Sequence, residues 1–323
     1  MEWFRGEKIP LLVVCGPTAS GKTGVGVKLA KALDGEVISA DSMQIYKGMG
    51  IATAVPDEKE REGIPHHLME FLEPEQPFSV ADYVELAKST AEDIISRGKL
   101  PVVVGGTGLY INSLVDNISF EKSETDGEVR RRLTEEAEKY GNEYMLEKLR
   151  KVDPKAAENI HPNNLIRVIR ALEMYELTGR TFEENQKLSR KNESPFEVCM
   201  IGLNYEDRQD LYDRIDRRVD IMADMGMADE ARAVYESGRM RTAAQAIGFK
   251  ELIPYFEGKA NLSDCLDRIK QVSRNYAKRQ LTWFRRDARI FWINQAINEQ
   301  SDKIIEKCLN IVAKSEIMCY NKK

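Results

Sequence analysis

The stretch LLVVCGPTASGKT, residues 11–23, is the most informative part of the sequence for the fold. Its first five residues are apolar and typical of a buried β-strand, and they lead directly into GPTASGKT, residues 16–23. This octapeptide matches the pattern G-x-x-x-x-G-K-[ST], which binds phosphate when a strand precedes it and a helix follows it. Helix-prone sequence follows as far as about residue 33. The stretch therefore predicts a P-loop at the amino end of a helix, where backbone N–H groups and the helix dipole favour an anion.

The P-loop supplies the first candidate site. We expect phosphate contacts from every residue of the octapeptide: Gly16, Pro17, Thr18, Ala19, Ser20, Gly21, Lys22 and Thr23. The Lys22 ammonium can reach a terminal phosphate, and the Thr23 hydroxyl suits Mg²⁺, which we expect as a cofactor. The alternative, a glycine-rich turn without a ligand, does not account for the flanking strand and helix.

Strand and helix patterns alternate through the first 120 residues. Residues 36–39 and 101–104 are short runs rich in Val and Ile, as in buried strands. Between these runs, Ser79 and Asp82 have the spacing of a capping box, and apolar residues recur behind them at helical period until Gly98. Strand–helix–strand repeats of this kind indicate a parallel sheet with helices on both faces.

Residues 121–195 differ in character, because they are charged, helix-prone and almost free of β-branched runs. Strand patterns return at 196–203 and 290–293. We therefore expect an α/β fold: a P-loop core, residues 1–120 and 196–323, with a parallel sheet flanked by helices. An all-helical insertion domain is expected at residues 121–195.

Composition excludes several classes of protein. With 42% hydrophobic and 31% charged residues, the chain has the composition of a soluble globular protein. No apolar run reaches the roughly 18 residues of a membrane span, and the formal net charge of −5 excludes a uniformly basic coat for nucleic acid. The first ten residues lack the apolar core of a signal peptide, and the five cysteines form no CxxC motif. We expect a reduced, cytoplasmic, monomeric enzyme that does not associate with membranes.

A second candidate group follows the next strand along the chain. NTPases normally carry an acidic residue at the end of a later hydrophobic strand, but the run at 101–104 leads into Gly105, Gly106 and Thr107. This weakens the hypothesis of a kinase or ATPase. Asp41 instead ends the strand that follows the P-loop. Because the carboxyl ends of parallel strands line the ligand crevice, we expect Asp41 to face the phosphate pocket.

Eight blocks of sequence, in this order, resemble a known family, the tRNA dimethylallyltransferases (isopentenyl transferases). They are GPTASGKT (16–23), ADSMQIYKGMGIATA (40–54), PHHL (65–68), FSVADY (78–83), GGTGLY (105–110), HPNNLIRVIRALE (161–173), QAIGFKE (245–251) and YAKRQLTWFRR (276–286). A P-loop by itself is weak evidence, whereas eight ordered blocks across nearly the whole chain are specific. The chain departs from the usual family pattern at Gly50, Ala52, Val55 and Ile166, and these departures bear on RNA contacts rather than on the chemistry.

The resemblance implies an activity. A dimethylallyl group would pass from dimethylallyl diphosphate to the exocyclic N6 amine of an adenine beside the anticodon of tRNA. The P-loop would hold diphosphate, Asp41 would be the base at the amine, Thr107 would line the reaction channel and Arg218 would bind the leaving diphosphate. Since an adenine in the anticodon stem-loop is stacked, it would have to flip out to reach this channel.

The resemblance also assigns RNA contacts, to Asp41 and Thr107 and to five further regions. These are Ser42, Met43 and Gln44; Arg130; Ile166, Arg167, Val168, Ile169 and Arg170; Gln245, Ala246, Ile247, Gly248, Phe249 and Lys250; and Lys278, Arg279, Gln280, Leu281, Thr282, Trp283, Phe284 and Arg285.

The last of these regions is unusual in charge. Residues 268–289 contain eight Lys or Arg and one acid, Asp287, a local net charge of +7. Tyr276, Trp283 and Phe284 are interleaved with these cations. Cations and aromatic rings together suit phosphate contacts and base stacking, whereas the simpler alternative is a solvated charged face.

Several candidates have plain structural alternatives. Arg218 lies among aspartates, so its alternative role is that of an ion-paired residue on a solvated helix. Thr107 comes after Gly105 and Gly106, and its alternative role is that of a helix N-cap. For His66 and His67 no third metal ligand has suitable spacing, so we expect one packed and one exposed histidine. His161 precedes a proline and is expected in a turn.

Three other functions remain open from the residues. A small-molecule kinase would bind ATP at the P-loop, use Asp41 as base and close the helical insertion as a lid. A prenyltransferase acting on a free adenylate would share the P-loop and Asp41 but would not need the basic stretch. A non-catalytic RNA-binding module would need neither the P-loop nor Asp41.

Overall fold

The computed structural model describes residues 2–3, 6–120, 127–238 and 246–322. The chain forms two compact units, one made of Met1–Val115 and Ser194–Lys323 and the other of Asp116–Glu193. Each unit has hydrophobic core residues of its own. Within the described ranges, no helix combines the length and the apolar character needed to cross a membrane.

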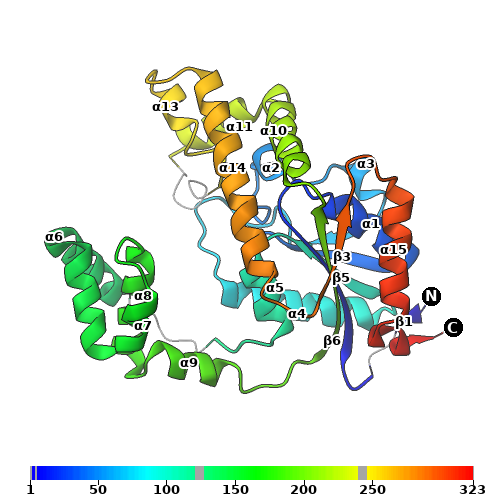
Figure 1. The fold of residues 1–323 in the computed structure, drawn as a ribbon, viewed down its shortest axis with the longest axis horizontal. Coiled ribbons are helices and arrows are strands. Elements are labelled where there is room, and N and C mark those ends of the chain that lie inside the picture. The colour runs from blue at the N-terminus through cyan, green and yellow to red at the C-terminus, as the bar shows by residue number, and fades with distance from the viewer. Residues whose placement is uncertain (1, 4–5, 121–126, 239–245, 323) are drawn as a thin grey trace. The chain divides into compact units, whose positions relative to one another are not determined.

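The larger unit is built on a six-stranded parallel sheet of order β4-β3-β5-β2-β6-β7 (Figure 1). The strands are β2 (Ile9–Cys15), β3 (Gly35–Ala40), β4 (His66–His67), β5 (Leu100–Gly105), β6 (Phe196–Tyr205) and β7 (Ile290–Gln295). Every residue of β2, β3 and β5 is buried, so both faces of the central sheet are covered. The parallel α/β fold predicted from the sequence is confirmed, with five of these strands at the predicted positions.

Helices cover the sheet and extend beyond its carboxyl edge (Figure 1). They are α1 (Lys22–Ala32), α2 (Gly50–Thr53), α3 (Glu58–Arg61), α4 (Val80–Ser96), α5 (Gly108–Val115), α10 (Arg208–Asp224), α11 (Met227–Glu236), α13 (Ile253–Phe256), α14 (Leu262–Phe284), α15 (Ser301–Ala313) and the 3₁₀ helix η1 (Glu316–Tyr320). Helix α1 packs on β3 and β5 and against α15, and α10 packs along α14. Two short strands, β1 (Glu2–Trp3) and β8 (Asn321–Lys322), pair antiparallel near the two ends of the chain.

Helix α4 begins and ends as its sequence predicts. The Ser79 hydroxyl accepts a hydrogen bond from the Asp82 amide, and the Asp82 carboxylate accepts one from the Ser79 amide, which completes the capping box. Gly98 follows the last turn in the left-handed region, at φ +74°, where glycine carries no steric penalty.

Strand β4 was not predicted. His66 and His67 pair with Val37 and Ile38 at the edge of the sheet. The expectation of one packed and one exposed histidine was wrong, because both are half-buried. His66 Nδ1 lies 2.8 Å from the Ile64 carbonyl, and His67 Nε2 lies 2.8 Å from a Glu36 carboxylate oxygen.

The smaller unit is helical throughout its described part. It contains α6 (Gly127–Val152), α7 (Pro154–Asn159), α8 (Leu165–Thr178) and α9 (Phe182–Ser189). Gly141, at φ +84°, interrupts α6 and divides it into two helical segments. Leu133, Met145 and Leu172 are among the residues of its core. His161 serves the predicted turn before α8, where its carbonyl accepts the Asn164 amide at 2.8 Å.

Glu36 joins three elements of the larger unit at the amino end of β3. Its carboxylate, 3% exposed, accepts hydrogen bonds from both terminal nitrogens of Arg97 and lies 3.6 Å from Lys99 Nζ, besides the contact with His67. The Arg97 hydrogen bonds outweigh the effect of burial and lower the pKa of Glu36 to about 2. The ionised carboxylate therefore stabilises the folded state.

We predict that Glu36→Gln lowers the free energy of unfolding by about 2 kcal/mol at pH 7, a value reduced from the pKa shift because Arg97 is partly exposed. Since the folded-state pKa lies below the ordinary value of 4.5, the stabilisation is present above pH 4.5 and is lost as the pH falls toward 2. The difference between wild type and variant, measured by urea unfolding, should therefore shrink between pH 5 and pH 3. Glu85→Gln, at an exposed position of α4, is the matched control. A difference that stays constant with pH would contradict this account.

Candidate active site

The register of the sheet brings three loops to one edge. Cys15, the last residue of β2, pairs with Gly105 on one side and Gly202 on the other, and Ala40 also pairs with Gly105. The P-loop, Asp41 and the Gly106–Thr107 loop therefore leave the sheet at the same level. Gly105 has to be glycine, because a Cβ there would lie 2.2 Å from the Ala40 carbonyl oxygen.

The P-loop connects β2 to α1 in a conformation that few sequences adopt. Gly16 and Gly21 have φ values of +152° and +84°, and Ala19, at φ +62°, is also left-handed. No side chain caps the amino end of α1, so its first N–H groups remain available to an anion. The Lys22 ammonium donates a hydrogen bond to the Pro17 carbonyl at 3.1 Å, within the loop itself.

Two adjoining cavities open from this edge of the sheet. The inner cavity has a volume of about 60 Å³, and its polar lining includes Lys22 and Thr23. The outer cavity has a volume of about 290 Å³ and a more apolar lining that includes Met43 and Met222. Five residues line both cavities and so mark their junction: Thr18, Asp41, Thr53, Arg218 and Tyr276.

Two half-buried cations, Lys22 and Arg218, lie near one carboxylate, Asp41, at this junction. Burial, and next the neighbouring Arg218, lower the pKa of Lys22 to about 8, while Asp41 acts in the opposite direction. Burial also lowers the pKa of Arg218, again opposed by Asp41. Because desolvated positive charge is costly, the inner cavity is electrostatically suited to an anion with more than one negative charge.

Hydrogen bonds orient the polar groups beside these cations. Asp41 Oδ1 accepts the Met43 amide at 2.9 Å, and Thr107 Oγ accepts the Ser42 amide at 3.1 Å. Thr107 directly precedes α5, so its backbone position is that of the predicted N-cap, while its hydroxyl turns toward Ser42. The Tyr276 phenol lies close to Thr107, and burial together with the Asp41 charge raises its pKa.

Tyr276 is a site residue that sequence reasoning missed. It stands in the quoted YAKRQLTWFRR block, but as one aromatic residue among cations it was interpreted as an RNA-stacking group. In the structure it lines both cavities beside Asp41. Tyr276 and Gln280 are one helical turn apart and so lie on the same face of α14. This spacing is the sequence signal that could have assigned Tyr276 to an inward-facing side of the helix.

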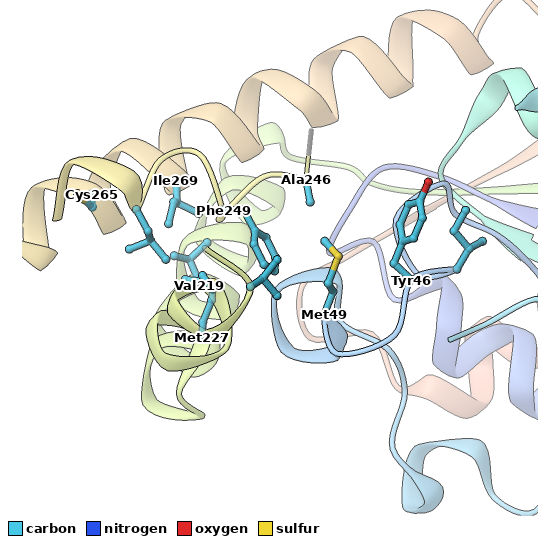
Figure 2. Packing of buried hydrophobic residues seen from close by; sticks show 12 residues of the cluster. Tyr46, Met49, Val219, Met227, Ala246, Phe249, Cys265 and Ile269 are labelled. Carbon is cyan, nitrogen blue, oxygen red and sulfur yellow. The ribbon is translucent and has the colours of Figure 1, made fainter. Parts of the chain in front are cut away.

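A buried hydrophobic cluster supports the outer cavity (Figure 2). Tyr46 and Met49, from the segment after Asp41, pack in one cluster with Val219 of α10, Met227 of α11 and Ile269 of α14. Val219, Met227 and Ile269 also line the outer cavity. The apolar wall of the site is therefore part of a continuous core, which holds its shape.

The other residues of the segment after Asp41 differ in role. Ser42 and Met43 line the outer cavity. Gln44 is buried, and its amide donates to the Thr53 and Ala54 carbonyls at 3.1 and 3.0 Å while accepting the Ser39 hydroxyl. Through these hydrogen bonds, Gln44 holds the segment after Asp41 against the end of β3 and against Thr53 and Ala54.

Of the predicted RNA-contact region 245–250, Gln245 lies outside the described residues. Ala246, Ile247 and Lys250 line the outer cavity, whereas Phe249 is fully buried in the hydrophobic cluster. Gly248, at φ +107°, donates its amide to Glu251 at 2.9 Å. This segment forms one wall of the outer cavity.

Helix α14 presents only part of its basic stretch to solvent. Lys278, Arg279, Thr282 and Arg285 are exposed, and Trp283 is 36% exposed with its indole N–H donated to Asn112. The three remaining predicted contacts of this region are Gln280 and Phe284, which are buried, and Leu281, which is half-buried.

Part of the predicted +7 charge is compensated within the larger unit. Lys270 pairs with Asp220 at 2.6 Å, and Arg274 pairs with Asp216 at 2.5 Å. Arg289 pairs with the one acid of the stretch, Asp287. The positive surface available to a nucleic acid is therefore smaller than the sequence indicates.

The predicted RNA-contact residues of the smaller unit divide in the same way. Although burial opposes it, the Arg130 and Arg170 guanidinium groups, each 2.7 Å from Glu173, lower the pKa of this carboxyl. Val168 and Ile169 are buried in the core of the unit. Arg167 is exposed, and Ile166 is 84% exposed, so this end of α8 presents a cation and an apolar side chain together.

Fold and site together define a class, that of P-loop α/β proteins with a buried anion pocket and an adjoining carboxylate. Comparison with known families is specific: residues 44–287 match the model of the family described as IPP transferase, and residues 9–70 match the isopentenyl transferase model.

Individual relatives agree with these matches. The chain is 47% identical to a tRNA dimethylallyltransferase from Acetivibrio thermocellus, over 92% of this chain and 95% of that one. It is 46% identical to the enzyme of that name from Halalkalibacterium halodurans, over 93% and 95% of the two chains. The chain therefore belongs to the IPP transferase family.

Solved structures show the same fold. The full-length tRNA isopentenylpyrophosphate transferase from Bacillus halodurans matches with a TM-score of 0.71 and 45% identity, covering 95% of this chain and 96% of that one. A eukaryotic dimethylallyltransferase, described as acting on tRNA, matches with a TM-score of 0.78 and 30% identity, covering 95% and 80% of the two chains.

We predict that affinity for inorganic pyrophosphate, measured by titration calorimetry, falls by up to about tenfold per pH unit as the pH rises above the Lys22 pKa of about 8. The reason is that Lys22 binds the anion as an ammonium and loses its proton there. Lys22→Arg stays charged throughout, so its affinity should lack this step, while ionisation of pyrophosphate itself affects both proteins equally. The same pH dependence in both proteins would show that Lys22 does not titrate in the pocket.

Proposed function

We propose that the chain transfers a dimethylallyl group from dimethylallyl diphosphate to the N6 amine of an adenine next to the anticodon of tRNA and releases diphosphate. Membership of the IPP transferase family supports this activity over that of a small-molecule kinase. The observation that carries it structurally is the position of Asp41 at the junction of a cationic cavity and a more apolar one. This arrangement separates a charged leaving group from a flat, weakly polar acceptor and places a carboxylate between them.

The chemistry follows from the charges at the junction. The exocyclic amine is a weak nucleophile because its lone pair is delocalised into the ring, so the reaction depends on activation of the electrophile. The bond between C1 of the allyl group and the diphosphate oxygen breaks, and Lys22, Arg218 and the P-loop amides stabilise the charge that develops on this oxygen. The bond between N6 and C1 forms, and Asp41 takes the proton that the amine loses.

Mg²⁺ fits the polar lining of the inner cavity. The Thr23 hydroxyl lines that cavity beside Lys22, and Asp41 provides a carboxylate in the same lining. Mg²⁺ is usually coordinated by one or two protein groups together with phosphate oxygens and water molecules. One threonine hydroxyl beside a diphosphate is consistent with this coordination. Mg²⁺ bound through Thr23 would supply further positive charge to the departing diphosphate.

The acceptor reaches the outer cavity as a flipped base. The cavity of about 290 Å³ has apolar side chains for the faces of a purine ring, and Arg279 and Lys250 are basic groups in its lining. Exposed cations beyond it, including Lys278 and Arg285, suit backbone phosphates. The proposed tRNA substrate supports a cytoplasmic location.

We predict that the protein, mixed with Mg²⁺, labelled dimethylallyl diphosphate and either bulk tRNA or AMP, transfers label to tRNA. Asp41→Asn should lower turnover at least about 100-fold, the usual contribution of a positioned base, while pyrophosphate binds at least as tightly because a negative charge has left the pocket. Asp213→Asn, at an exposed position of α10, is the control. Label on AMP would indicate a prenyltransferase for free adenylates, and unchanged turnover of Asp41→Asn would remove this residue from the mechanism.

We also predict that the salt dependence of tRNA binding distinguishes exposed cations from paired ones. Each phosphate contact contributes roughly 0.7–0.9 to the slope of log affinity against log salt concentration. Arg285→Gln should therefore reduce the slope by about that amount. The double variant Arg274→Gln/Asp216→Asn, which removes an ion pair without changing net charge, should leave the slope unaltered. Equal reductions in both proteins would mean that the ion pair opens to bind RNA.

A further inference from the structure

Three backbone groups of the P-loop are held by side chains from the carboxyl-terminal part of the larger unit. The Thr18 amide donates to Gln280 Oε1 at 2.8 Å, the Ala19 carbonyl accepts Arg214 Nε at 3.3 Å, and the Ser20 carbonyl accepts Gln295 Nε2 at 2.6 Å. The two carbonyls and the amide are therefore already hydrogen-bonded to side chains of the protein. The shape of the P-loop is thus set by distant side chains as well as by its own glycines.

Gln280 differs from the other two side chains because it holds a second catalytic loop as well. Its Nε2 donates to the Gly106 carbonyl at 2.9 Å, and its amide lies close to the Tyr276 phenol, one helical turn earlier. A Cβ on Gly106 would lie 2.3 Å from Gln280 Nε2, so a side chain at this position would displace the amide. One buried side chain, 5% exposed, therefore joins the P-loop to the residue that precedes Thr107.

We propose that Gln280 is a positioning residue for group transfer: its amide fixes the P-loop relative to the Gly106–Thr107 loop and so aligns the leaving diphosphate with Asp41. This inference rests on the proposed prenyl transfer. It replaces the expectation that Gln280 contacts tRNA, since its donors and its acceptor oxygen are engaged inside the protein.

The geometry explains why loss of the Gln280 amide would lower the rate of the reaction. The Thr107 hydroxyl accepts the Ser42 amide, next to Asp41, and the Tyr276 phenol lies close to both Thr107 and Gln280. A shift of the Gly106–Thr107 loop relative to the P-loop therefore changes the distance between the cationic pocket and the carboxylate. Misplacement of reacting groups by about 1 Å can cost about 100-fold in rate. Lys278, which is exposed on the same helix, lines neither cavity, so its position need not change.

The first test replaces the amide by an apolar side chain of similar length. Gln280→Met should lower kcat for prenyl transfer by about 10- to 100-fold, while the KM for tRNA stays within about twofold. Gln271→Met, at an exposed position of the same helix, is the matched control and should keep wild-type values. A raised KM or Kd for tRNA with unchanged kcat would overturn the proposal in favour of an RNA contact.

The second test uses pH and does not depend on the first variant folding well. In Gln280→Glu, an ionised carboxylate accepts the Thr18 amide but cannot donate to the Gly106 carbonyl, whereas a protonated carboxyl does both. Its kcat relative to wild type, at saturating dimethylallyl diphosphate, should therefore rise as the pH is lowered from 8 to 6. A ratio that does not change with pH, together with wild-type kcat, would overturn the proposal. If the wild-type protein itself transfers no label, the proposed function fails instead.

Discussion

The parallel register of β2, β3 and β5 is the constraint on which the site depends. Cys15, Ala40 and Gly105 stand at one level of the sheet, so the residues after them enter the same space. This level is fixed by main-chain hydrogen bonds and by the absence of a side chain at Gly105, which lets the β3 backbone approach. A shift of one residue in either pairing would reverse the faces of a strand and separate Asp41 from the P-loop.

At this edge of the sheet, the positive charges of Lys22 and Arg218 exceed the negative charge of Asp41, and a bound anion would complete the balance. Lys22 and Arg218 are both desolvated, and the Arg218 charge further destabilises the charged form of Lys22. Asp41 offsets part of this cost but not all of it, as the lowered pKa values of both cations show. In the proposed reaction, a diphosphate would supply the missing negative charge, and the same positive field would act on the departing oxygen.

The features predicted correctly from the sequence are those that depend on local patterns of residues. The P-loop, the strands around it and the capping box of α4 are encoded within a few neighbouring residues each, so they were predicted near their observed bounds. The place of Asp41 followed from a general rule about strand ends. Strand β4 was missed because two residues carry no periodicity, and its partner was not visible from the sequence.

Contacts between distant segments account for what the sequence did not reveal. Gln280 meets Thr18 across 262 positions of the chain, so the residues around Gln280 do not reveal its partner. Likewise, the pairing of Arg130 and Arg170 with Glu173 depends on how α6 and α8 pack. For these residues a family pattern indicates importance, but only the structure separates contact with a substrate from support of the protein itself.

The pairing of α10 with α14 shows why a chain of net charge −5 contains so basic a segment. Asp216 and Asp220 of α10 pair with Arg274 and Lys270 of α14, so ion pairs join the two helices along one side. Another face of α10 carries Arg218 to the cavities, and another face of α14 carries Tyr276 there. The basic stretch therefore contains two groups of cations that its sequence does not separate: some hold the two helices together beside the cavities, and others are exposed and are the ones proposed to contact RNA.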